Sequence, residues 1–174
     1  MNRAQSKLLL YQELSRQTGS CFRLACLEDG QITESSWKTD MWNLSFLVGA
    51  PLGEIQVTLD FREEWIDVLA FPHPRIVDED CVLEIVRFVN CLNGYVKLQD
   101  TNGRFYVDET DLDVAYSARL SYKYLELMPQ EAVSHGVLGF LGFVADASVP
   151  LYQVGQGDMT AEEGCQYMVE LWME

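Results

Sequence analysis

Four carboxylates near the middle of the chain have the clearest capacity for chemistry: Asp108, Glu109, Asp111 and Asp113. Carboxylates at this spacing could bind a cation or share a proton in general acid–base catalysis. They fall between two predicted strands, however, where acidic side chains commonly occupy loops and solvent-facing positions. We therefore favour a solvated loop, and an enzyme that uses residues 108–113 is the least favoured of three functional hypotheses.

Other catalytic and metal-binding patterns are missing from the sequence. The two histidines, His73 and His135, belong to no HxH, HExxH or H-x-E pattern. No GxSxG motif supplies a nucleophilic serine, nothing selects a Cys–His pair, and no glycine cluster leads into the Gly-Lys-Ser/Thr of a phosphate-binding loop. The sequence therefore predicts a protein that is not an enzyme and has no catalytic residue, metal site or cofactor.

The cysteines favour free thiols in a reducing compartment. They stand at positions 21, 26, 81, 91 and 165, an odd number with no CxxC spacing, which argues against a disulfide framework and against zinc. The N-terminal segment MNRAQSKLLLYQELSRQ is typical of an amphipathic helix, not of a signal peptide. The longest apolar stretch, residues 136–145, is about half the length that a membrane span needs. We therefore expect a cytoplasmic protein.

The charge of the chain restricts its partners. Its 174 residues include 12 Lys and Arg against 27 Asp and Glu, a formal net charge of −15. All basic residues lie at or before Lys123, and only acidic charges follow Tyr124. Such a protein repels phosphate backbones and anionic lipids, so we predict neither nucleic acid nor a membrane as partner. The acidic C-terminal third is either a solvated face or a docking surface for a basic protein.

Alternation of apolar and polar residues predicts strands, and apolar spacings of three and four predict helices. The stretch 112–124 is the clearest strand. Gly19 is expected to end the first helix, Pro129 to begin the last long helix, and Pro150 to end or kink it. Thr160 and Glu163 fit a capping box. The predicted elements are a helix over 2–18, strands over 22–26, 42–48, 55–61 and 65–71, a helix over 80–93, a hairpin over 95–108, a strand over 112–124, and helices over 130–147 and 160–172.

These elements predict an α+β fold, an antiparallel sheet with helices packed on one side and its second face partly open. The predicted order is α-β-β-β-β-α-β-β-β-α-α. The length and the 48% hydrophobic content are typical of one globular domain, residues 1–174, in which 149–174 form a possible C-terminal helical extension.

The segment IVRFVNCLNGYVKLQDTNGRFYVDE, from Ile85 to Glu109, resembles the bacterial YbjN-like family. In that family, too, a helix rich in Asn, Leu and Val is followed by G-R-F-Y-x-D and a long alternating strand. The likeness covers about 25 positions in residues and 1–148 in topology, whereas 37–48 and 149–174 depart from it. The family shares its fold with the type III secretion chaperones, which are acidic homodimers that hold an extended client. The resemblance therefore implies a binding function.

The first hypothesis is a non-enzymatic protein-binding module, a homodimer that holds an extended or apolar segment of a partner. The helix over 80–93 would form the dimer interface through Val82, Ile85, Val86 and Val89. The first helix and the sheet would contact the partner through Leu8, Tyr11, Leu14, Trp42 and Trp65. The alternative is an acidic inhibitor or nucleic-acid mimic that binds a basic protein surface.

Overall fold

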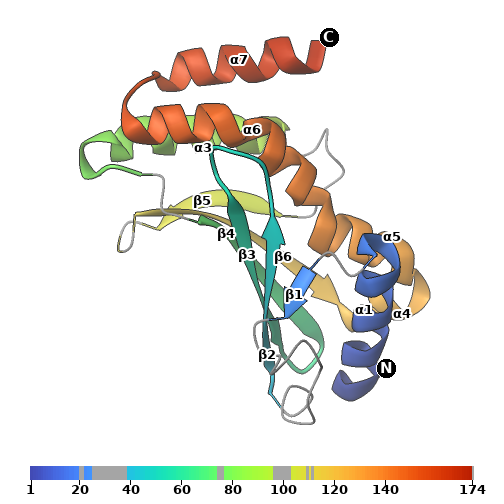
Figure 1. Ribbon diagram of the computed structural model, residues 1–174. Coiled ribbons are helices and arrows are strands. Elements are labelled where there is room, and N and C mark those ends of the chain that lie inside the picture. Colours follow the sequence, from blue (N-terminus) through green and yellow to red (C-terminus); the bar gives the residue numbers. More distant parts are fainter. Residues whose placement is uncertain are drawn as a thin grey trace.

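The computed structural model describes residues 1–19, 22–24, 39–73, 77–95, 103–108, 110 and 112–173. Its centre is a six-stranded sheet in the order β1-β2-β3-β4-β6-β5, in which every neighbouring pair is antiparallel. The predicted α+β class with an open antiparallel sheet is confirmed (Figure 1). The strands are β1 (Phe22–Leu24), β2 (Met41–Leu47), β3 (Glu54–Phe61), β4 (Trp65–His73), β5 (Arg104–Asp108) and β6 (Asp113–Ser121).

The helices lie before, between and after these strands. Helix α1 precedes the sheet, the 3-10 turn η1 leads into α3 between β4 and β5, and the remaining helices follow β6. Residues 96–102, which include most of one predicted strand, lie outside the described residues, so that part of the predicted order is not tested. The described order differs after β6, where four helical elements, not one long helix, precede the last helix. The helical elements are α1 (Arg3–Thr18), η1 (Glu79–Cys81), α3 (Val82–Tyr95), α4 (Tyr122–Leu127), α5 (Pro129–Val133), the π-helical turn η3 (Ser134–Leu138), α6 (Gly139–Gln156) and α7 (Ala161–Met173).

Three predicted helix boundaries are confirmed. Gly19 ends α1 in the left-handed conformation, with φ 58°, which glycine adopts without steric cost. Pro129 occupies the first turn of α5, where its missing N–H costs no helical hydrogen bond. The Thr160 backbone N–H and hydroxyl both donate to Glu163, at 2.8 Å each, so the predicted capping box forms before α7.

The strand predicted over 112–124 ends at Ser121, three residues early. The Ser121 hydroxyl accepts a hydrogen bond from the Tyr124 backbone N–H at 3.1 Å and thereby caps α4. Tyr122 turns into the core, where its hydroxyl donates to the Arg62 carbonyl at 2.6 Å. The apolar–polar alternation therefore continues in the sequence after the strand has ended.

Pro150 does not end the last long helix, and the predicted helix end near residue 147 is wrong. Pro150 lies inside α6, which continues to Gln156 and ends at Gly157 with φ 81°. A proline removes one helical hydrogen bond, but α6 is held on both sides of it, because Ala147 and Leu151 are fully buried. By length and composition alone the run Pro129–Gln156 could cross a membrane, yet half of its most apolar window is buried inside the fold.

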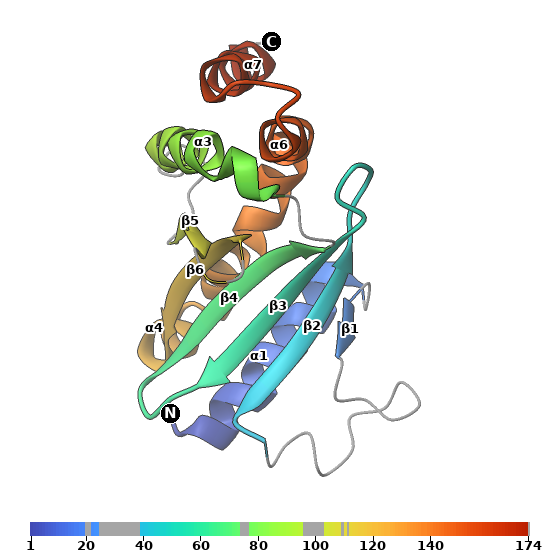
Figure 2. The same cartoon turned by 90° about the vertical axis from the view of Figure 1, so that its left-hand side faces the viewer.

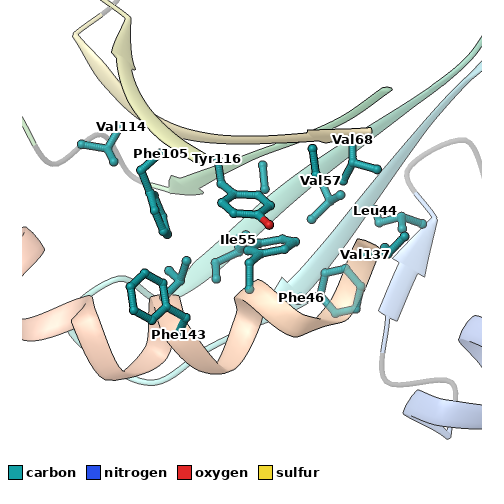
Figure 3. Close-up of a cluster of buried hydrophobic side chains, with 14 of the residues drawn as sticks. Leu44, Phe46, Ile55, Val57, Val68, Phe105, Val114, Tyr116, Val137 and Phe143 are labelled. Carbon is teal, nitrogen blue, oxygen red and sulfur yellow. The ribbon is translucent and has the colours of Figure 1, made fainter. Parts of the chain in front are cut away.

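The core lies between one face of the sheet and the helices. The inward side chains of β2, β3, β4 and β6 are buried, and α1 lies behind β2 and β3 (Figure 2). The run of η3 and α6 packs on the same face, beside side chains of β2, β3, β5 and β6 (Figure 3). Its Phe140 ring stacks on Tyr116 at 4.6 Å, and Phe143 lies 5.4 Å from Phe105. Among the described residues, helices therefore cover one face of the sheet only.

Residues 149–173 belong to this packing: they include the end of α6 and the whole of α7, which lies on α3 and α6 (Figure 1). Met168 is fully buried, and the Trp172 ring stacks on Phe143 at 5.3 Å. A disulfide joins Cys91 of α3 to Cys165 of α7. The prediction of free thiols is therefore wrong for this pair. Cys81 is free, and the cysteines at positions 21 and 26 lie outside the described residues.

Candidate functional site

The candidate functional site is the face of the sheet that no helix of the described chain covers (Figure 2). The registers of the five strand pairs align its outward side chains in rows across the sheet. One row runs from Asn43 on β2 to Arg104 on β5 and passes through polar side chains and a half-buried leucine. We call this surface the open face; its central residues are Asn43, Ser45, Gln56, Thr58, Asp67, Leu69, Phe71, Arg104, Tyr106, Ser117 and Arg119.

Asp67 is the centre of a charged network at one end of the open face. Its carboxylate accepts a hydrogen bond from Arg119 Nε at 3.0 Å and from Arg62 Nε at 3.1 Å. Arg62 also pairs with Asp60 at 2.6 Å. The Arg119 guanidinium lies over the Trp65 ring, 4.7 Å from its centroid. Two contacts therefore fix the direction of the Arg119 side chain, which remains 64% exposed.

This network makes the protein sensitive to acid. Partial burial raises the pKa of Asp67, but the hydrogen bonds from Arg119 and Arg62 outweigh it and hold that pKa below the ordinary value of 3.8. A carboxylate with a lowered pKa stabilises the folded state fully above the unfolded pKa, and this contribution is lost as the pH falls through the folded pKa. We expect Asp67→Asn to flatten the loss of stability below pH 4, measured by urea unfolding at several pH values. An unchanged pH dependence would contradict this role.

A groove of about 780 Å³ runs along β5 and β6 on the open face. Arg104 and Arg119 lie on two of its sides, and Ser117 and Tyr106 contribute hydroxyl groups. Arg104 is exposed and makes no ion pair with any described residue. The groove therefore offers positive charge and hydroxyl groups in a protein that is strongly acidic elsewhere.

The β5 edge of the sheet is protected by a side chain. Asn93 of α3 donates to the Phe105 carbonyl and accepts from the Phe105 N–H, both at 2.8 Å. These two backbone groups point away from β6, so they are the groups that an added strand would use. Because Asn93 occupies them, this part of β5 is closed to strand addition.

The predicted partner-binding residues do not form one surface. Leu14 and Trp42 are 0% exposed and belong to the core. Leu8 is 49% exposed and Tyr11 is half-buried on α1, behind the sheet, whereas Trp65 is half-buried on the open face. The predicted binding surface is wrong because alternation identifies the apolar side of a strand, and the helices cover that side. Of the five, only Trp65 lies on the uncovered side.

The predicted dimer-interface residues also divide. Ile85 and Val89 are buried within the single chain, at 0 and 3% exposure, because α3 packs against β5, α6 and α7. Val82 and Val86 are half-buried, and the neighbouring Leu83 is 62% exposed. Any contact between two copies through α3 would therefore use Val82, Leu83 and Val86 rather than the inward pair.

The acidic segment that first suggested chemistry lies where β5 ends and β6 begins. The Asp108 carboxylate accepts a hydrogen bond from the Thr110 backbone N–H at 2.9 Å. In the strand register, Asp108 of β5 stands opposite Asp113 of β6. Positions 109 and 111 lie outside the described residues. Within the described part of the chain, no three His, Cys, Asp or Glu side chains gather where they could hold a metal ion.

The sequence reasoning missed Asp67, Arg104 and Arg119 as parts of one site. The only signal was the alternation over 112–124, which places Arg119 on the solvent side of its strand. The proximity of the three residues depends on β6 lying between β4 and β5, which no local pattern reveals.

Comparison with known proteins adds no relative from which a function could be taken. No family model matches the chain, and neither a curated protein nor a solved structure matches it. The resemblance to the YbjN-like family therefore stays a prediction from the segment 85–109.

Proposed function

We propose that this protein is a non-enzymatic binding protein that holds an extended segment of a partner protein on the open face. The observation that carries the proposal is a sheet of six strands with one face free of helices. That face is not uniformly polar: Trp65, Leu69 and Phe71 of β4 are half-buried between polar neighbours. Large apolar side chains set among hydrogen-bonding groups are typical of protein-binding surfaces.

An extended segment suits this surface better than a helix or a small molecule. Side chains of an extended chain alternate with a period of two residues, which corresponds to the alternating rows of a sheet. The protected β5 edge argues that the segment lies across the face, not beside Phe105 as a seventh strand. The groove along β5 and β6 would receive part of it.

The predicted resemblance to YbjN-like proteins and secretion chaperones supports the same class of function. A homodimer is part of this proposal, with contact through the exposed side of α3 at Val82, Leu83 and Val86. A cytoplasmic location remains a prediction from the N-terminal sequence.

The proposal is tested by site-specific photo-crosslinking in the source cells. A photoreactive amino acid replaces Gln56, which is exposed on the open face, or Gln166, which is exposed on α7. We expect a partner to crosslink from position 56 and not from position 166, with the crosslinked peptide lying in a segment that the free partner leaves unstructured. Gln12, exposed on α1 behind the sheet, is the matched control. Equal crosslinking from positions 12 and 56 would contradict a specific open-face site.

A separate observation supports the alternative function, an acidic inhibitor or nucleic-acid mimic that binds a basic protein surface. On η1, α3, α6, α7 and the turns joined to them, exposed acids are frequent, and Arg87 is the one basic residue among residues 77–95 and 139–173. This end of the molecule would suit a basic protein surface. In that case the partner would crosslink from position 166, and the complex would dissociate above roughly 0.3 M salt because exposed charges are then screened within several ångströms. The exposed acids are Asp78, Glu79, Asp80, Asp146, Asp158, Glu162, Glu163 and Glu170.

A further inference from the structure

The groove along β5 and β6 has a charge opposite to that of the molecule. Its charged lining consists of Arg104, Arg119 and Asp67, two cations against one anion, whereas the whole chain carries −15. Asp67 is in addition paired with Arg62, which lies outside the groove lining. The groove therefore concentrates positive charge where the rest of the chain would repel an anion.

The two arginines line the same groove, so one extended segment can contact both. Arg104 stands opposite Ser117, and Arg119 is two residues further along β6 on the same face. Such diagonal neighbours lie about 7–8 Å apart, with their Cβ atoms somewhat closer. The Arg119 guanidinium points toward β4, where it contacts Asp67 and Trp65, whereas Arg104 lies on β5, so the two guanidinium groups serve different parts of a bound segment.

The Arg119 guanidinium is held in place before any ligand arrives. Its Nε donates to Asp67 and its plane lies over Trp65, while its two terminal amino groups make no hydrogen bond to a described residue. A guanidinium that is already oriented loses less side-chain entropy on binding. Arg104, which has no ion pair among the described residues, supplies a second guanidinium group with its N–H donors. Ser117, which stands opposite Arg104, adds a hydroxyl group.

We infer that the partner segment is acidic, and that Arg104 and Arg119 each bind the carboxylate of an Asp or Glu side chain. Planar guanidinium groups match the two oxygens of a carboxylate, and charge-assisted hydrogen bonds are stronger than neutral ones. The aromatic ring of Tyr106 and the half-buried Leu69 would contact the apolar neighbours of those side chains. This inference rests on the proposed function, because it names the chemistry of the segment held on the open face.

The test compares two blocked peptides, Val-Glu-Val-Glu-Val-Glu and Val-Gln-Val-Gln-Val-Gln, titrated into the full chain at pH 7 and low salt. Amide and arginine Nε–Hε chemical shifts on β5 and β6 report binding. We expect the glutamate peptide to bind about tenfold more tightly, a difference of about 1.4 kcal/mol. Arg104→Gln should remove most of this preference. Arg16→Gln, on α1 behind the sheet, is the control and should keep it.

The outcomes separate this inference from the proposed function. Equal binding of both peptides at β5 and β6 would overturn the carboxylate preference and leave the open face as a peptide site. No shift on β5 and β6 with either peptide would overturn the inference and remove the support for the open face as well. Sodium acetate is titrated at the same carboxylate concentration. If it produces the same chemical-shift changes to saturation, the site binds a free carboxylate and the inference of a peptide ligand is overturned.

Discussion

Replacing Cys165 with Ser lowers the free energy of unfolding by about 2–4 kcal/mol relative to the oxidised wild-type protein. The disulfide to Cys91 closes a loop of sequence separation 74, so it reduces the conformational entropy of the unfolded chain considerably. It also fastens α7, the last described helix, to α3. Urea unfolding without reductant measures the difference.

Two comparisons make this result specific. Wild-type protein in excess reductant should unfold at nearly the same urea concentration as Cys165→Ser. Cys81→Ser, which removes the free cysteine, should leave the disulfide contribution intact. If the oxidised wild type and Cys165→Ser unfold together, or if thiol titration of the native protein finds Cys91 reactive, the disulfide does not hold α7 in solution.

Asn93→Ala lowers the free energy of unfolding by about 2 kcal/mol and opens the β5 edge. Each of the two hydrogen bonds to Phe105 contributes about 1 kcal/mol, and the loss of both leaves a backbone N–H and a carbonyl without their partner. An edge strand with free backbone groups pairs readily with another chain, so the variant should also self-associate. Urea unfolding measures the first effect, and light scattering at increasing concentration measures the second.

Asn90→Ala is the matched control, because Asn90 lies on the same helix with its side chain exposed. It should change the stability by a few tenths of a kcal/mol, as surface substitutions usually do. If the two variants are equally stable, Asn93 does not join α3 to the sheet. If Asn93→Ala is destabilised but stays monomeric, the edge is protected by something other than this side chain.

Local patterns were sufficient for most elements of this fold. The alternation over 112–124 predicted β6 and its solvent face, and the Thr160–Glu163 spacing predicted the start of α7. Gly19 and Pro129 marked helix ends for reasons that act within one turn of the backbone. Such signals can be read from sequence because the interacting groups are only a few residues apart.

The wrong predictions concern contacts between residues that are far apart in sequence. Pro150 is tolerated because distant core residues hold α6 on both sides of it, and Cys91 meets Cys165 because α7 packs on α3. Both depend on contacts between residues that are far apart in sequence. A short-range rule is overridden wherever such packing contributes more free energy than the local preference.

The candidate site depends both on local sequence alternation and on the order of the strands in the sheet. Alternation over 112–124 predicted by itself that Arg119 faces solvent, because a strand turns successive side chains to opposite sides. The sequence assigned no solvent face to Arg104 or to Asp67, whose strand carries apolar residues on both faces. Only the tertiary structure brought the three residues together, by placing β6 between β4 and β5, and only it assigned Trp42 and Leu14 to the core. The physical reason is that strand pairing and helix coverage are decided by the burial of the whole apolar surface, which no single segment specifies.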